Sequence, residues 1–219
     1  MLRKAWAVTA MSLALCGLAH SSDLADAPTV RVGDIWKYRQ VDGFTKEVDL
    51  EFSLRVVDIT GSEITTKQEI KGRDGSKIVI YDRFWNLIDD GNVKYEPFSG
   101  LRSFPLTIGK VMRREYRGTT FKTGISIKCT VSGQYEAWEN ITVPAGTFET
   151  LRLEEDIECR GTGTNTATNK TIYKSWYAPS VNRFVRTESQ VMSDGRVRVK
   201  KGFELVSYSP ARQDPGHVP

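Results

Sequence analysis

The sequence predicts an all-β protein: a single antiparallel meander sheet, strongly curved or rolled into an incomplete barrel. Three observations lead to this fold class. Asp-Gly pairs, which tolerate the positive φ angles of tight hairpin turns, recur at four places. A central segment folds onto itself with a cysteine at each end. Beyond the N-terminal apolar segment, no stretch keeps an apolar period of 3.6 residues.

The expected strands follow one another along the chain with tight turns between them, so the sheet must curve or close to protect its edges. Strands are expected at residues 34–41, 45–59, 62–72, 77–88, 92–97, 111–121, 125–138, 147–160, 169–178, 182–192 and 197–208. A short helical turn is expected near residues 98–103.

The hairpin over residues 129–159 is the most specific prediction. A Pro-Ala-Gly turn at residues 144–146 lies at its middle. Folding there puts Cys129 opposite Cys159, which predicts a disulfide between them. The apolar pairs that share their face are Val131 with Ile157, Tyr135 with Leu153, and Ala137 with Leu151. A slip of one residue would lose the cysteine pair and both faces together.

The Asp-Gly turns predict further pairs of facing residues. The turns lie at Asp42-Gly43, Asp74-Gly75, Asp90-Gly91 and Asp194-Gly195. The predicted pairs are Ile35 with Leu50, Ile70 with Val79, Ile64 with Trp85, Met192 with Val197, and Glu188 with Lys201 as an ion pair.

The N-terminus has the pattern of a secretory signal. Arg3 and Lys4 precede an apolar run that is short for a membrane span, and small residues favour cleavage near Ala19. Lipid attachment at Cys16 and an uncleaved N-terminal anchor remain as alternatives. Removal of the signal leaves two cysteines, an even number that favours a disulfide in an oxidising compartment.

The chain is therefore divided into four parts. We expect a signal peptide at residues 1–19, a disordered linker at 20–29, a single β domain at 30–209 and a disordered tail at 210–219. No second apolar segment is long enough to cross a membrane, so no transmembrane segment is expected in the mature chain.

Charge and histidine content exclude several functions. The formal net charge of +4, less the two charges of Arg3 and Lys4, is +2, which gives no argument for nucleic acid. The two histidines, His20 and His217, lie at the signal junction and in the tail. Ser-His-Asp and Cys-His nucleophilic sites and histidine zinc sites are therefore not expected. We predict no catalytic residue, no metal site and no cofactor.

An acidic run in the second half of the hairpin is the candidate for carboxylate chemistry. Glu154, Asp156 and Glu158 share the polar face of the strand, which favours a solvated surface over a catalytic carboxylate pair. Glu155 falls on the apolar face opposite Gly133, where it finds room or turns outward.

One strand near the C-terminus has a basic face. Arg196, Arg198 and Lys200 alternate with Val197 and Val199. This face either binds an anionic surface or is a charged solvent face that discourages aggregation, and we favour the second reading. A second basic cluster comprises Arg113, Arg114 and Arg117.

Aromatic residues of several strands are candidates for a ligand cavity. The predicted ligand-binding residues are Trp36, Tyr38, Trp85, Trp138 and Trp176, with Phe84 and Tyr177 beside them. Such residues line a cavity for an apolar ligand or pack as ordinary core, and packing is the commoner role.

Four segments carry a resemblance to known proteins. They are VGDIWKY at residues 32–38, FPLTIGK at 104–110, ITVPAGTFET at 141–150 and WYAPSV at 176–181. In this order they resemble a group of secreted bacterial β-domains of unknown function, loosely similar to the Lol-type lipoprotein-carrier fold. The resemblance implies a sheet rolled into an incomplete barrel, and it supplies no catalytic residues. Asn182 stands where the group has glycine, and asparagine also tolerates a left-handed turn.

These observations favour a non-enzymatic exported envelope protein, periplasmic or secreted, that binds a lipid or other apolar or amphipathic ligand, or an envelope protein partner. One alternative is a structural or assembly factor without a ligand pocket. Another is a carboxylate-based hydrolase of an envelope polymer. An aromatic-lined cavity would favour the first function, a filled barrel with an exposed edge the second, and two facing carboxylates the third.

Overall fold

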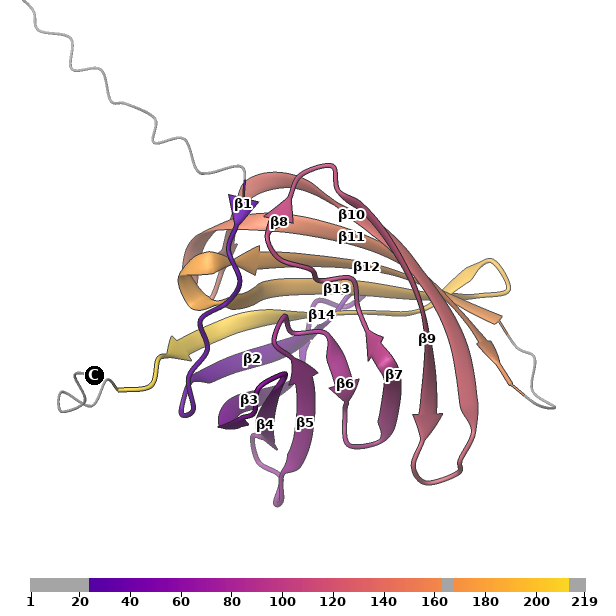
Figure 1. The fold of residues 1–219 in the computed structure, drawn as a ribbon, viewed down its shortest axis with the longest axis horizontal. Helices are drawn as coiled ribbons and strands as arrows, with labels where there is room; N and C mark the ends of the chain where they lie inside the picture. The colour runs from indigo at the N-terminus through magenta and orange to yellow at the C-terminus, as the bar shows by residue number, and fades with distance from the viewer. Residues whose placement is uncertain (1–23, 163–167, 213–219) are drawn as a thin grey trace, which may run out of the picture.

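The computed structural model describes residues 24–162 and 168–212, most of which form a barrel of antiparallel strands (Figure 1). The barrel strands are β2 (Ile35–Asp42), β3 (Val48–Ile59), β4 (Glu63–Ile70), β5 (Lys77–Asp82), β6 (Leu87–Asp89), β7 (Val93–Ser99), β9 (Val111–Thr120), β10 (Ser126–Val143), β11 (Gly146–Gly161), β12 (Thr168–Ala178), β13 (Arg183–Ser193) and β14 (Arg196–Ser209). A separate pair consists of β1 (Leu24–Ala25) and β8 (Leu106–Thr107). The described residues contain no helix that is long and apolar enough to cross a membrane.

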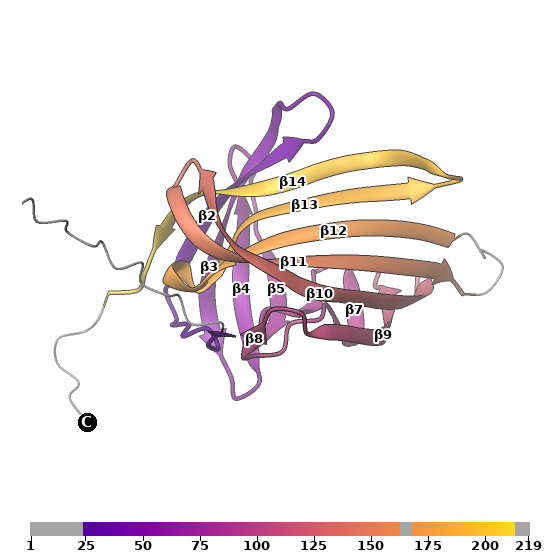
Figure 2. The ribbon, with the colours of Figure 1, turned by 90° about the horizontal axis from the view of Figure 1, so that it is seen from above.

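The predicted all-β, antiparallel sheet is confirmed, but the incomplete barrel is wrong because the sheet closes on itself. β7 pairs with β9, and β9 pairs with β10. The last strand, β14, returns beside the first barrel strand, β2, where Arg39 forms an ion pair with Glu204 at 2.7 Å. Seen from above, β11 to β14 run side by side as long strands (Figure 2). Closure gives every barrel strand a neighbouring strand on both sides, so none lies at the edge of the sheet.

The central hairpin confirms the predicted register in its outer half, which runs from the two cysteines to Tyr135 and Leu153 and lies away from the turn. Cys129 lies opposite Cys159, and the two form a disulfide with their Cα atoms 4.1 Å apart. Tyr135 lies opposite Leu153, as expected. The alternation of apolar and polar residues therefore fixes this half of the hairpin.

The inner half of the hairpin differs by one residue. A β-bulge follows Tyr135, so Leu151 faces Trp138 and the predicted pair with Ala137 is wrong. The extra residue allows a two-residue turn to join Val143 to Gly146. A uniform register cannot anticipate a bulge, because one inserted residue leaves the apolar pattern on either side intact.

The pairs predicted at two Asp-Gly turns are wrong because their loops are longer than two residues. Between β2 and β3, residues 43–47 form the loop and Ile35 faces Arg55 instead of Leu50. Between β4 and β5, the register differs from the predicted one by four residues, so Val79 does not face Ile70 and Ile64 does not face Trp85. The pairs in the structure are Thr66 with Val79 and Ile64 with Tyr81.

The hairpin between β13 and β14 confirms its Asp-Gly turn, in which both central residues have positive φ. Met192 faces Val197, as predicted. A bulge beyond this pair shifts the register by one residue. Glu188 therefore faces Gly202, and the predicted ion pair with Lys201 is wrong.

Two local predictions also change. The strand expected at residues 77–88 is divided into β5 and β6 by a turn at residues 83–86. Residues 98–103 contain no helical turn; the one helical segment among the described residues is the 3-10 helix Pro179–Val181. Asn182 ends this helix in the left-handed conformation, with φ of 55°.

Part of the expected linker is ordered. Leu24–Ala25 lies within residues 20–29 and pairs as β1 with β8. Ala25 is 2% exposed and Leu106 is fully buried, so apolar contact with the core holds the pair.

Several expectations fall outside the described residues. These are the signal peptide with cleavage near Ala19, the alternative of lipidation at Cys16, both histidines, and the tail from residue 213. They stay predictions.

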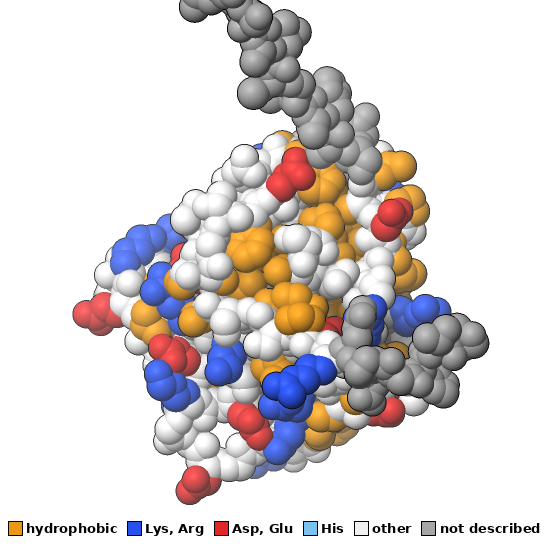
Figure 3. Space-filling view, turned by 90° about the vertical axis from the view of Figure 1, so that its left-hand side faces the viewer, with side chains coloured by type: hydrophobic (Ala, Val, Ile, Leu, Met, Phe, Trp, Pro, Cys, Tyr) orange, Lys and Arg blue, Asp and Glu red, His pale blue; other side chains and the backbone are white. Residues whose placement is uncertain are grey.

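The apolar inner faces of the strands form two clusters. The larger cluster is rich in aromatic residues, among them Trp36, Trp85 and Tyr177. The smaller cluster surrounds Cys129 with Leu101, Tyr116 and Val131. Apolar side chains also gather on the side of the molecule shown in Figure 3, with Lys and Arg side chains below them.

We expect removal of the disulfide to destabilise the protein. Cys129 and Cys159 are separated by 30 residues, and closing such a loop is worth about 3 kcal/mol on the chain-entropy model. The loss in the double alanine variant should be smaller than this, because the hairpin already holds its two ends together. Urea unfolding of the two proteins measures it, and two free thiols in the unreduced wild type would contradict the structure.

Candidate functional site

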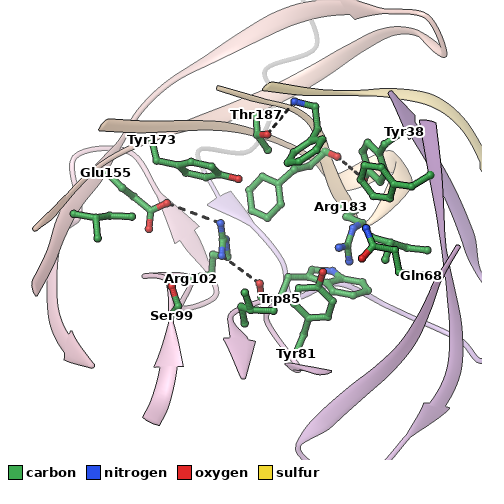
Figure 4. A pocket seen from close by; sticks show the side chains of 17 residues that line it. Tyr38, Gln68, Tyr81, Trp85, Ser99, Arg102, Glu155, Tyr173, Arg183 and Thr187 are labelled. Carbon is green, nitrogen blue, oxygen red and sulfur yellow. Dashed lines mark hydrogen bonds and ion pairs between the residues drawn. The ribbon is translucent and has the colours of Figure 1, made fainter. Parts of the chain in front are cut away.

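The barrel holds a cavity of about 350 Å³ that is partly open to solvent (Figure 4). Its walls are mainly apolar and aromatic. The apolar residues of the lining are Phe52, Leu54, Leu87, Ile157, Phe184 and Phe203. Four larger aromatic residues with polar atoms, Tyr38, Tyr81, Trp85 and Tyr173, complete most of the wall. A concave, apolar site with a few polar groups is the usual form of a small-molecule site.

Three charged side chains enter this apolar cavity: Arg102, Glu155 and Arg183. Arg183 and Glu155 are 7% and 4% exposed, and the side chain of Arg102 is 10% exposed. The Arg102 Nη2 to Glu155 Oε2 distance of 3.9 Å is long for an ion pair. Among the described atoms, Arg102 Nε, Glu155 Oε1 and Arg183 Nη1 have no hydrogen-bond partner. Buried polar atoms in folded proteins are nearly always paired. Other buried atoms without a partner, among them the hydroxyls of Tyr135 and Tyr177, belong to residues outside the cavity lining.

Arg183 lies within a set of aromatic rings. Its guanidinium carbon is 3.9 Å from the centre of the Trp85 ring, 4.9 Å from that of Tyr81 and 5.4 Å from that of Trp36. The negative faces of these rings attract the cation. The arrangement stabilises the charge of a side chain that has little contact with water.

The ring beneath Arg183 is placed by an unusual turn. Trp85 has φ of 66°, a left-handed conformation that is strained for a bulky residue. The carboxylate of Asp82 holds the turn by accepting hydrogen bonds from the Phe84 and Asn86 backbone amides, both at 2.8 Å. The Trp85 indole nitrogen donates to the Asn182 carbonyl at 2.8 Å. These contacts fix the indole at the cavity wall.

Arg102 is held by a buried asparagine. Asn86 Oδ1 accepts a hydrogen bond from the Arg102 backbone amide at 2.9 Å, and Asn86 Nδ2 donates to the Arg102 carbonyl at 2.8 Å. Arg102 Nη1 donates to the Trp85 carbonyl at 3.2 Å, and its guanidinium carbon lies 4.6 Å from the centre of the Phe184 ring. The turn that carries Trp85 thus also positions Arg102.

Glu155 confirms part of its sequence prediction. It lies opposite Gly133 on the inward face of β11, and it points into the lumen, not outward. A Cβ atom at Gly133 would lie 2.2 Å from the Glu154 carbonyl oxygen, so glycine is required at this close approach. Burial raises the pKa of the Glu155 carboxyl, and Arg102 opposes this shift only in part.

The predicted aromatic residues divide between this cavity and other sites. Tyr38 and Trp85 line the cavity, and Trp36 lies behind them, with its ring centre 5.4 Å from that of Trp85. Trp138 and Trp176 are not in the lining. The Trp176 indole nitrogen donates to Glu139 at 2.7 Å, so this residue links β12 to β10 across β11.

The predicted surface residues are found on the outside. Glu154 forms an ion pair with Lys174 at 2.8 Å and Asp156 with Lys170 at 3.4 Å, which agrees with a solvated strand face. Arg196 and Arg198 are exposed, and Lys200 is partly exposed. Their proposed contact with an anionic surface stays a prediction.

Sequence reasoning missed Arg102 and Arg183 as site residues. Arg102 lies between β7 and β8 in a segment without strand alternation. Arg183 follows the Asn182 turn and begins β13, where nothing in the local pattern distinguishes it from a surface arginine. Only Glu155 gave a signal, as a charge on an otherwise apolar face. The described residues contain no group of His, Cys, Asp or Glu that could hold a metal ion.

Comparison with known proteins supports the fold. No protein-family model and no curated protein sequence matches the chain. A solved protein of Parabacteroides distasonis, provisionally designated a lipoprotein, is 15% identical, with a TM-score of 0.56 over 86% of this chain and 100% of its own. A Bacteroides fragilis protein, provisionally designated an exported protein with a YmcC-like fold, is 12% identical, with a TM-score of 0.55 over 84% of this chain and 99% of its own.

We expect Gly100→Ala to destabilise the protein more than Gly109→Ala. Both glycines have positive φ, 122° and 73°, so both variants carry backbone strain. A Cβ at Gly100 would also lie 2.6 Å from Asn86 Oδ1 and 2.7 Å from Arg102 Nη1, whereas nothing lies within 4 Å at Gly109. The free energies of unfolding measured by urea denaturation should differ by about 1–3 kcal/mol between the two variants. Equal losses would mean that Asn86 and Arg102 move freely.

We expect Glu155→Gln to flatten the dependence of stability on pH. The folded protein binds the Glu155 proton more tightly than the unfolded chain, since burial raises its pKa above the ordinary value of 4.5. Stability should therefore fall as pH rises from about 4.5 through the higher folded pKa. Glu155→Gln removes this fall. Urea unfolding at several pH values tests it, with Glu158→Gln on the exposed face of β11 as the control. Parallel curves for wild type and Glu155→Gln would refute the prediction.

Proposed function

We propose that this protein is an exported, non-catalytic binding protein whose barrel lumen holds an amphipathic ligand. The observation that carries the proposal is the mixed lining of the cavity. Phe52, Phe203 and their apolar neighbours suit a hydrocarbon body, while unpartnered polar atoms of Arg102, Glu155 and Arg183 suit a polar end.

The other two functions have less support. An assembly factor that works through a sheet edge would need a free edge, and the barrel strands of the described chain are closed. A hydrolase of the usual two-carboxylate type would need a second carboxylate facing the first. Glu155 is the one carboxylate among the described residues of the lining.

Export is supported by three observations. The N-terminus has the pattern of a secretory signal, with cleavage proposed near Ala19. The Cys129–Cys159 disulfide suits an oxidising compartment. The Bacteroides fragilis protein of similar fold is itself described as exported. The similarity to the Lol-type lipoprotein-carrier fold belongs to this proposal, because a barrel with an apolar lumen suits a protein that shields a hydrocarbon chain.

The proposal predicts a bound apolar or amphipathic molecule. Native mass spectrometry of the protein purified from its own envelope should show an added mass that organic solvent extracts. The delipidated protein should then bind the neutral fluorescent probe N-phenyl-1-naphthylamine. Leu87→Trp, which fills the cavity, should weaken probe binding about 10-fold or more, since a bulky ring occupies part of the 350 Å³.

Ile59→Trp provides the control, because Ile59 is exposed and lies outside the lining. It should bind the probe as the wild type does, and urea midpoints should show that both variants fold. A wild-type protein without a retained molecule and without probe binding would refute the proposal.

A further inference from the structure

We propose that the lumen selects an anionic amphiphile: a single hydrocarbon chain ending in an oxyanion group that lies against the guanidinium groups of Arg183 and Arg102. This inference rests on the proposed function, and it names the chemical class of the ligand.

The first argument is the balance of charge in the cavity. Two arginines and one carboxylate line it, so even an ionised Glu155 leaves a net positive charge. Glu155 approaches Arg102, at 3.9 Å, and leaves Arg183 without a carboxylate partner within residues 24–162 and 168–212. A buried cation without an anion is unfavourable, so the cavity is suited to receive one.

The second argument is the geometry of Arg183. The rings of Trp85, Tyr81 and Trp36 contact the guanidinium, and this contact stabilises its charge. Rings provide no strong acceptor for the N–H groups, which lie in the plane of the guanidinium. Arg183 lines the cavity and interacts with the Tyr38 hydroxyl, while its Nη1 is buried without a hydrogen-bond partner in the described structure. Nη1 carries two N–H donors in the plane of the guanidinium, and such donors suit an oxygen of a carboxylate or phosphate.

The position of Arg183 argues against a purely structural role. Arg186, on the same strand, also lies over a tryptophan, with its guanidinium carbon 5.2 Å from the centre of the Trp176 ring. Arg186 forms an ion pair with Glu188, and it is absent from the cavity lining. The strand thus carries one arginine with a carboxylate partner outside the cavity and one without such a partner inside it.

The size of the cavity limits the hydrocarbon part. About 350 Å³ is near the lower end of the range of about 300–1,000 Å³ for small-molecule sites. Phe52 and Phe203, whose ring centres are 5.3 Å apart, narrow the apolar part further. This space suits one hydrocarbon chain.

The test compares four probes with the same twelve-carbon chain. They are dodecanoate, dodecyl phosphate, dodecanol and dodecyltrimethylammonium, the three ionic probes used below their critical micelle concentrations and dodecanol below its solubility limit. Displacement of N-phenyl-1-naphthylamine from the delipidated full chain gives their affinities. We expect the anionic probes to bind about 10- to 100-fold more tightly than dodecanol, which corresponds to one or two charge-assisted hydrogen bonds. The ratio of the carboxylate to the phosphate affinity identifies the head group.

Arg183→Gln should remove this preference and retain dodecanol binding. Arg186→Gln is the matched control and should keep the preference. If Arg183→Gln does not fold, Arg102→Gln and the wild-type probe series decide the question. Equal affinities for all four probes, or tighter binding of the cationic one, would overturn the inference and leave the proposed function standing. Failure of every probe to bind would count against the proposed function itself.

Discussion

The number of strands in the closed sheet is the constraint on which the rest of this structure depends. A barrel of about eight strands is just wide enough for its own side chains to fill. Here twelve strands close, and two apolar clusters leave a cavity of about 350 Å³. The wider circumference therefore explains how large residues such as Trp36 and Tyr177 are fully packed while the lumen still retains space.

The buried charged side chains in that cavity are held in place by specific contacts with neighbouring residues. Asn86 holds the backbone of Arg102, and the same turn presents Trp85 in a left-handed conformation beneath Arg183. Such a conformation costs about 1–3 kcal/mol and persists only where its surroundings enforce it. Strain, a buried asparagine and two buried guanidinium groups in one region distinguish a site from ordinary core, which would be more stable with apolar residues alone.

Local pattern predicted the parts of the fold that depend on alternation. The pairing of Cys129 with Cys159 and the inward position of Glu155 followed from a period of two, and both are present. Bulges and long loops were not predicted, because an inserted residue changes the register without changing the pattern. Arg102 and Arg183 were missed for a different reason: the rings around them come from segments distant in sequence. Trp36 of β2, Tyr81 of β5 and Trp85 of the following turn surround Arg183, and Phe184 of β13 contacts Arg102. A single charged residue carries no sign of which rings will surround it.

The closing contact between β2 and β14 has a consequence for the order of folding. Arg39 and Glu204 are 165 residues apart, so the seam of the barrel joins nearly the first and the last structured segments. When the chain is made or exported with its N-terminus first, one edge of β2 stays unpaired until β14 is available to pair with it. Hairpins such as β10–β11 can form early, but the lumen exists only after the last strand is in place, and such non-local closure is slow. A molecule can therefore occupy the lumen only after the C-terminal strand β14 has paired with β2, whatever hairpins have formed before.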